Sequence, residues 1–178
     1  VELVGALRVG APQLHDLDLS GNPVCGVEEG GRDEFSTELV EALCAWLQEE
    51  GAALQSLALV DVALCGLARD GNGSYQSQAI SLLVELLSSG RAPLRSLNIT
   101  GCRVQEDEAL DLGKSLSRNT TLEKLLADRT ALAVQQLLSG ERLNLNGLDF
   151  SEVDATLMAQ LLVHNTQLTC ADLGGSKQ

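Results

Sequence analysis

The chain has 178 residues, a net charge of −13 and only 2% aromatic residues. A chain of this length can bury one sizeable core, so we expect a single domain. The acidic charge opposes binding to nucleic acids or anionic membranes, and the scarcity of aromatic side chains argues against a surface that stacks bases. No apolar run approaches the ~20 residues of a membrane span, so we expect neither a nucleic acid nor a membrane as partner.

A leucine pattern, L-x-x-L-x-L, recurs along the chain and sets its predicted organisation. Full or weaker copies begin at residues 14, 54, 94, 122, 145 and 168, with spacings of 40, 40, 28, 23 and 23 residues. In L-x-L, both apolar side chains point to one face of a short strand. We therefore predict strands near residues 14–19, 54–59, 94–99, 122–127, 145–150 and 168–173.

Apolar residues at helical spacing lie before the first strand and between the later ones. Strands joined through helices should be parallel, with right-handed crossovers. A unit of strand, turn, helix and turn buries its apolar face only by stacking on the next unit. Helices are predicted over residues 1–10, over about 36–50, in SQAISLLVELLSS, in EDEALDLGKSLSRN, briefly over Ala131–Leu138, and over about 157–162.

The two 40-residue repeats are longer than the 28-residue one because of inserted loops at residues 26–34 and 67–75. Each insertion follows a strand and precedes a helix, which places both loops on the same rim of the stack, one above the other. Two interpretations are equally favoured. The loops are either tolerated insertions or a composite binding rim, since insertions in repeats often cluster on a binding side.

The stretches LHDLDLSGNPV, LQSLALVDVAL and LRSLNITGCRV, with the link SLSRNTTLEKL, resemble leucine-rich repeat proteins of the ribonuclease-inhibitor type. They are similar to repeats of NOD-like receptors, of tropomodulin and leiomodin caps, and of Ran GTPase-activating proteins. The resemblance implies an α/β fold, a curved horseshoe segment with a parallel β-sheet on its concave side and helices on its convex side. Residues 1–178 would form one domain of about six repeats, and we expect them to be a fragment of a larger protein. The leucines that carry the resemblance are core residues, so it indicates fold more than function.

The five cysteines form no C-x-x-C pair and are odd in number, which favours small buried residues over a disulfide framework or a zinc site. Cys44 lies on the apolar side of a predicted helix, and Cys102 lies at a turn position of the repeat. We therefore expect an intracellular location, in the cytoplasm or the nucleus. Three N-x-S/T sequons, at Asn72, Asn98 and Asn119, favour an extracellular alternative, and we interpret them as coincidental.

No combination of residues in the sequence points to catalysis. His15 and His164 fit surface or turn positions better than ligand positions, and neither of the glycine-rich nucleotide-binding motifs is present. We therefore expect no enzyme activity, no cofactor and no bound metal. A GTPase-activating role, with Arg32 or Arg69 of the inserted loops as a contact residue, is a minor alternative.

The residues between the inward-facing leucines should form a small, polar and acidic strip on the concave side. Interface anchors are usually Trp, Tyr or Arg, and the strip has almost none, so either the partner supplies them or the concave face is not the main interface. We predict a protein–protein interaction module that binds a basic protein or peptide segment through this strip and the inserted loops. The alternative is a structural or sensor part of a multidomain protein of the NOD-like receptor or filament-cap type. The predicted partner-binding residues are Asp16, Asp18, Ser56, Ser96, Asn98, Lys124, Asp128, Asp149 and Asp172.

Overall fold

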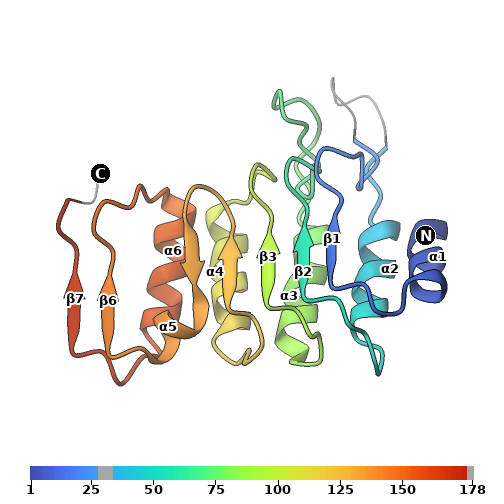
Figure 1. The fold of residues 1–178 in the computed structure, drawn as a ribbon. Helices are drawn as coiled ribbons and strands as arrows, with labels where there is room; N and C mark the ends of the chain where they lie inside the picture. The colour runs from blue at the N-terminus through green and yellow to red at the C-terminus, as the bar shows by residue number, and fades with distance from the viewer. Residues whose placement is uncertain (28–33, 176–178) are drawn as a thin grey trace.

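The computed structural model describes residues 1–27 and 34–175, and in them the repeated sequence forms a row of short strands with helices behind it (Figure 1). Five of the six predicted strands are present, each as three residues around the central position of its leucine pattern. They are β1 (Asp16–Asp18), β2 (Ser56–Ala58), β3 (Ser96–Asn98), β4 (Lys124–Leu126) and β7 (Cys170–Asp172). The other two described strands are β5 (Ala131–Ala133) and β6 (Arg142–Asn144).

The described strands form two sheets rather than one. Strands β1, β2, β3 and β4 are parallel neighbours, as predicted, and their register places Leu17, Leu57, Leu97 and Leu125 side by side. Strand β5 closes this five-stranded sheet by pairing antiparallel with β4. Strands β6 and β7 form a separate parallel pair. The fold is therefore mixed α/β, with a mostly parallel main sheet.

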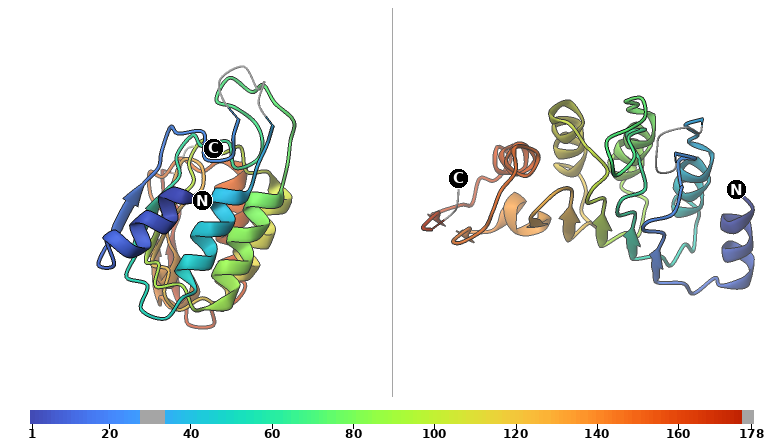
Figure 2. Two further views of the ribbon diagram at one scale, coloured as in Figure 1. Left: turned by 90° about the vertical axis from the view of Figure 1, so that its right-hand side faces the viewer. Right: turned by 90° about the horizontal axis from the view of Figure 1, so that it is seen from above.

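The helices lie in a second layer against one face of the strands (Figure 2). Helix α4 lies between α3 and α6 and contacts both. The short α5 instead lies in the row of strands, between β5 and β6 (Figure 2, right). No helix in the described part of the chain is long and apolar enough to cross a membrane. The helices are α1 (Glu2–Gly10), α2 (Glu38–Leu47), α3 (Gln78–Ser89), α4 (Glu106–Leu116), α5 (Val134–Ser139) and α6 (Glu152–Leu162).

Two sequence predictions between residues 131 and 150 are wrong. The strand expected at 145–150 is instead β6, at Arg142–Asn144, because the buried pair Leu143 and Leu145 (4% and 7% exposed) forms the inward face. The helix expected over Ala131–Leu138 begins only at Val134, because residues 131–133 pair with β4 as β5. In both cases the pairing partner decides between patterns that are locally equivalent.

The core lies between the strands and the helices and runs continuously along the described chain. The central leucines of the sheet are among its most buried members, with Leu57 at 1% and Leu97 and Leu125 at 0% exposure. Full burial of one such side chain stabilises the fold by about 2 kcal/mol. Helix α4 adds a buried stripe at helical spacing, formed by Ala109, Leu112 and Leu116. The leucines that define the repeat therefore act in the core, as predicted.

The prediction that the cysteines are small core residues is confirmed for four of the five. Cys25, Cys44, Cys65 and Cys102 are buried and free. Burial raises the pKa of the first three thiols to about 12 and that of Cys102 to about 11. The Cys102 Sγ also donates a hydrogen bond of 2.9 Å to the Leu59 carbonyl, which joins two successive turns. These thiols are therefore unreactive members of the core.

Cys170 is expected to react with iodoacetamide at pH 8 well before the other four thiols, because it is the one partly exposed cysteine and the thiolate is the reacting species. Mass spectrometry after brief labelling should find a single modified cysteine per native chain, and five after unfolding in urea. In the Cys170→Ser variant, rapid native labelling should disappear. Rapid modification of Cys44 or Cys102 in the folded protein would contradict the buried placement.

Two links from a helix to the next strand, those after α4 and α6, are each fixed by an asparagine, in the sequences NTTL and NTQL. Asn119 is 2% exposed, and its Nδ2 donates to the Leu87 carbonyl near the end of α3 at 2.9 Å. Its Oδ1 accepts from the backbone N–H groups of Thr121 (3.0 Å) and Leu122 (2.7 Å). Asn165 repeats this arrangement in the last link. These side chains satisfy backbone groups that the turn leaves without partners.

Candidate functional site

The strand face, defined as the outward residues of β1, β2, β3 and β4 opposite the helices, carries two rows of side chains. The register aligns Asp16, Ser56, Ser96 and Lys124 in the first row. It aligns Asp18, Ala58, Asn98 and Leu126 in the second row. The strand positions of the predicted strip are thus brought together on one surface of the main sheet.

Negative charge on the strand face is concentrated at β1. Asp16 and Asp18 are exposed. Hydrogen bonds from Ser20 lower the pKa of Asp18, with the Ser20 backbone N–H at 2.9 Å from Oδ1. These hydrogen bonds favour the charged form of the Asp18 carboxyl. On β4, three strands away in the same sheet, the exposed Lys124 carries a positive charge. The strand face is acidic at β1 rather than along its whole length.

The remaining three predicted residues lie away from this surface. Asp128 follows β4 in a turn at the carboxyl end of the main sheet. Asp172 is on β7, beside Asn144 in the separate two-stranded sheet. The placement of Asp149 in the strip is wrong, because its segment is not a strand. It lies after β6 instead and forms an exposed ion pair with Arg129 at 3.5 Å.

Loop 67–75 lies on the rim predicted for both insertions, and residues 28–33 of loop 26–34 fall outside the described residues. Val27, at the start of the first loop, shares a small buried cluster with Ala63 and Ala68. Ala68 belongs to the second loop, so the cluster joins the loops across successive repeats. This rim lies at the carboxyl ends of the parallel strands, the edge where open α/β sheets usually bind ligands.

The loop at residues 67–75 is fixed to its surroundings. An isolated antiparallel bridge joins Leu67 and Gly73 and makes the loop a narrow hairpin. Tyr75 is the last residue of the loop and forms a hydrogen bond with Glu108 of α4. Burial raises the pKa of Tyr75, and this hydrogen bond raises it further. The loop therefore holds one defined position above the rim (Figure 1).

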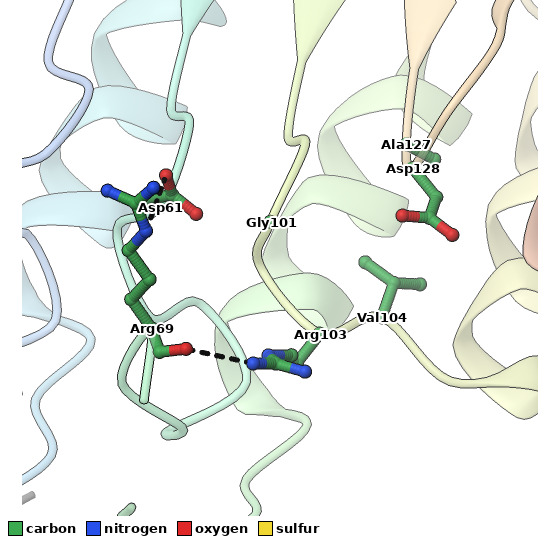
Figure 3. Close-up of a pocket in the computed structure, with 7 residues that line it drawn as sticks. All are labelled: Asp61, Arg69, Gly101, Arg103, Val104, Ala127 and Asp128. Carbon is green, nitrogen blue, oxygen red and sulfur yellow. Dashed lines mark hydrogen bonds and ion pairs between the residues drawn. The ribbon is translucent and has the colours of Figure 1, made fainter. Parts of the chain in front are cut away.

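Two adjoining pockets, of about 270 and 380 Å³, lie between this loop and the strand ends. They share Asp61 and Arg69 and together form the rim groove, made by turns 21–23, 61–63, 101–104 and 127–128 and by residues 68–69. The Arg69 Nε lies 4.0 Å from the Asp61 Oδ2. The Arg103 Nη2 donates to the Arg69 carbonyl at 2.9 Å (Figure 3). Charged side chains of both signs thus line the groove.

Sequence reasoning identified the loop and Asp128 but missed the rim groove. The one sequence feature that could have indicated the groove is the irregular turn VDVAL, which has Asp61 where the neighbouring turns have Gly21 and Gly101. Arg69, named for the GTPase-activating alternative, lines the groove, whereas Arg32 is outside the described residues. No protein-family model matches the chain, and no curated protein matches it either. The functional argument therefore rests on the geometry of these surfaces.

Proposed function

We propose that the chain is an interaction module of the leucine-rich repeat type, a curved horseshoe segment that binds a basic segment of another protein. The supporting observations are the repeated strand and helix units, in-register parallel strands and a core made by the repeated leucines. The observation that carries the binding role is the pair of exposed carboxylates, Asp16 and Asp18, at one end of a face of small side chains. Small residues leave room for an extended segment to lie across the strands.

An intracellular location is part of this proposal. Cys25, Cys44, Cys65 and Cys102 are buried free thiols, which suits a reducing compartment. The side-chain amide of Asn119, which a glycan would need, is buried and donates a hydrogen bond to the Leu87 carbonyl. These features support a coincidental origin for that sequon.

A lysine-rich peptide, such as acetyl-GKGKGKG-amide, is expected to bind at low salt through the β1 end of the strand face. The Asp16→Lys variant should weaken this binding about tenfold, because it turns an attraction of roughly 1 kcal/mol into a repulsion. Isothermal titration calorimetry or fluorescence anisotropy measures the change. Asp16 is exposed on the strand face, so the substitution should leave the fold intact.

The matched control is Glu85→Lys, which makes the same change of charge on the exposed side of α3. It should change the affinity less than twofold, because Glu85 is on the helix layer and away from the strand face. Equal losses in the two variants would show that only net charge matters. That result, or an unchanged affinity in Asp16→Lys, would contradict binding at the strand face.

Exposed apolar side chains favour a second function, in which the chain packs against other domains of a larger protein as a structural or sensor part. Val9 of α1 is 83% exposed, Val163 after α6 is 75% exposed, and Leu173 after β7 is 63% exposed. Packing against another domain would cover these side chains. A pull-down with the isolated chain distinguishes the two functions, since an intramolecular unit should capture no foreign protein. A GTPase-activating role is tested by GTP hydrolysis with candidate small GTPases.

A further inference from the structure

Backbone strain in the described chain is concentrated in the rim groove. Asp61, Ala63 and Arg103 are the only described residues other than glycine with positive φ, at 55°, 56° and 61°, and all three line the groove. A left-handed conformation of this kind costs about 1 kcal/mol or more per residue. Gly21 and Gly101 hold the turn positions equivalent to Asp61 and adopt the same conformation without that cost. Strain of this kind clusters at binding and catalytic sites.

Asp61 and Gly101 fit each other across the groove. A Cβ atom at Gly101 would collide with the Asp61 carboxylate, so the glycine is needed where that side chain lies. The Asp61 side chain is 31% exposed, whereas that of its partner Arg69 is 77% exposed. The middle of the groove therefore holds a long ion pair between a half-buried aspartate and an exposed arginine.

The length of the groove suits a short extended peptide. It crosses the turns that follow β1, β2, β3 and β4. Neighbouring strands are about 4.8 Å apart, so the groove spans about 15 Å. An extended chain rises about 3.3 Å per residue, and four or five residues fill that span.

The charges within the groove select the kind of peptide. Asp61 and Arg69 already face each other, which leaves Arg103 and Asp128 on either side of Val104 (Figure 3). Arg103 donates to a backbone carbonyl, and no ion pair joins either residue to an opposite charge in the described part of the chain. Two arginines and two aspartates balance, so neither a purely basic nor a purely acidic segment is complementary to the groove.

We propose that the rim groove binds an extended segment of a partner protein that carries an acidic side chain for Arg103 and, two residues away, a basic side chain for Asp128. Side chains two residues apart project to the same face of an extended segment, about 6.7 Å apart. The floor of Val104 and Ala127 packs against the aliphatic stem of the basic side chain. This binding uses different residues from the strand face and does not rest on the function proposed above.

The experiment is a titration of the ¹⁵N-labelled chain with short peptides at millimolar concentration, followed by NMR. The mixed peptides acetyl-GEGKG-amide and acetyl-GKGEG-amide cover both chain directions, and acetyl-GKGKG-amide and acetyl-GEGEG-amide are the like-charged probes. One mixed peptide is expected to shift the amide signals of Gly101, Val104 and Ala127 and to bind at least tenfold more tightly than either like-charged peptide. Shifts confined to the strand face around Ser96 would overturn the proposal, as would equal binding of all four peptides or none.

The decisive variant is Asp128→Lys, since Asp128 is partly exposed and lines the groove. It leaves two basic groups beside Val104, so the preference should move to the acidic peptide acetyl-GEGEG-amide. Asp149→Lys is the matched control, with the same change of charge at an exposed residue outside the groove, and should keep the preference for the mixed peptide. An unchanged preference in Asp128→Lys overturns the proposal. Binding of the lysine-rich heptapeptide and its loss in Asp16→Lys are scored separately, so either site can fail alone.

Discussion

Replacing Asn119 with alanine is expected to lower the free energy of unfolding by about 3 kcal/mol. The side chain is 2% exposed, and three backbone groups depend on it: the Leu87 carbonyl and the N–H groups of Thr121 and Leu122. Alanine removes all three hydrogen bonds and leaves the N–H groups of Thr121 and Leu122 without this partner at a buried link, and each such loss costs about 1–3 kcal/mol before relaxation. Urea unfolding monitored by circular dichroism measures the change.

Asn165→Ala is the matched control, because Asn165 has the same role in the last link. Its Nδ2 donates to the carbonyls of Leu137 and Gly140, both at 3.0 Å, and its Oδ1 accepts two backbone N–H groups. Asn165 is only partly buried, so water can replace some of these bonds, and we expect a loss of about 1–2 kcal/mol. A smaller loss for Asn119→Ala than for Asn165→Ala would contradict the importance of burial at the first link.

Gly113→Ala is expected to destabilise the protein by about 2 kcal/mol, although alanine is the better helix former. Gly113 is buried in α4 where α6 crosses it, and an added Cβ would lie 2.6 Å from the Gln160 Cβ and 3.1 Å from its Cγ. The Gln160 Cβ is fixed to its backbone, so α6 itself has to move. The clash therefore outweighs the gain in helix propensity of about 1 kcal/mol.

Gly5→Ala gives the opposite expectation in the same chain. Gly5 lies inside α1, and nothing is within 4 Å of an added Cβ. The propensity gain then acts alone, and the free energy of unfolding should rise by about 0.5–1 kcal/mol. Thermal unfolding of both variants measures the two signs. Stabilisation by Gly113→Ala would show that α4 and α6 approach less closely than the structure indicates.

The sequence was sufficient to predict most of the main sheet, because a repeating core imposes a repeating pattern. Leu17, Leu57, Leu97 and Leu125 occupy equivalent positions and are paired in register. The pattern was ambiguous after residue 131, where L-x-L and an equivalent L-x-F occur five residues apart, at 143–145 and 148–150. Both have the period of a strand, and only pairing with β7 selects the first. Local periodicity contains no information on pairing partners.

The candidate surfaces were predictable to a different extent. Alternation within a strand was enough to place Asp16, Asp18, Ser96 and Asn98 on one face, because the side-chain period of a strand is two. The rim groove was not predictable, because it depends on how loop 67–75 folds back over the turns. The contact from Arg103 to the Arg69 carbonyl, between residues 34 apart, fixes that position. Nothing in the local sequence of either residue specifies it.

The interruption between β5 and β6 defines where cooperative unfolding can stop. Backbone hydrogen bonds connect neighbouring strands from β1 through β5 in one sheet and β6 with β7 in the other. In the described residues, no such ladder connects the two sheets. Helix α6 lies between β6 and β7 in the chain and contacts α4 and α5. Opening of β6 and β7 therefore leaves every ladder bond of the five-stranded sheet in place. We therefore expect the amides of β6 and β7 to exchange as a smaller and less protected unit, with α5 at its boundary.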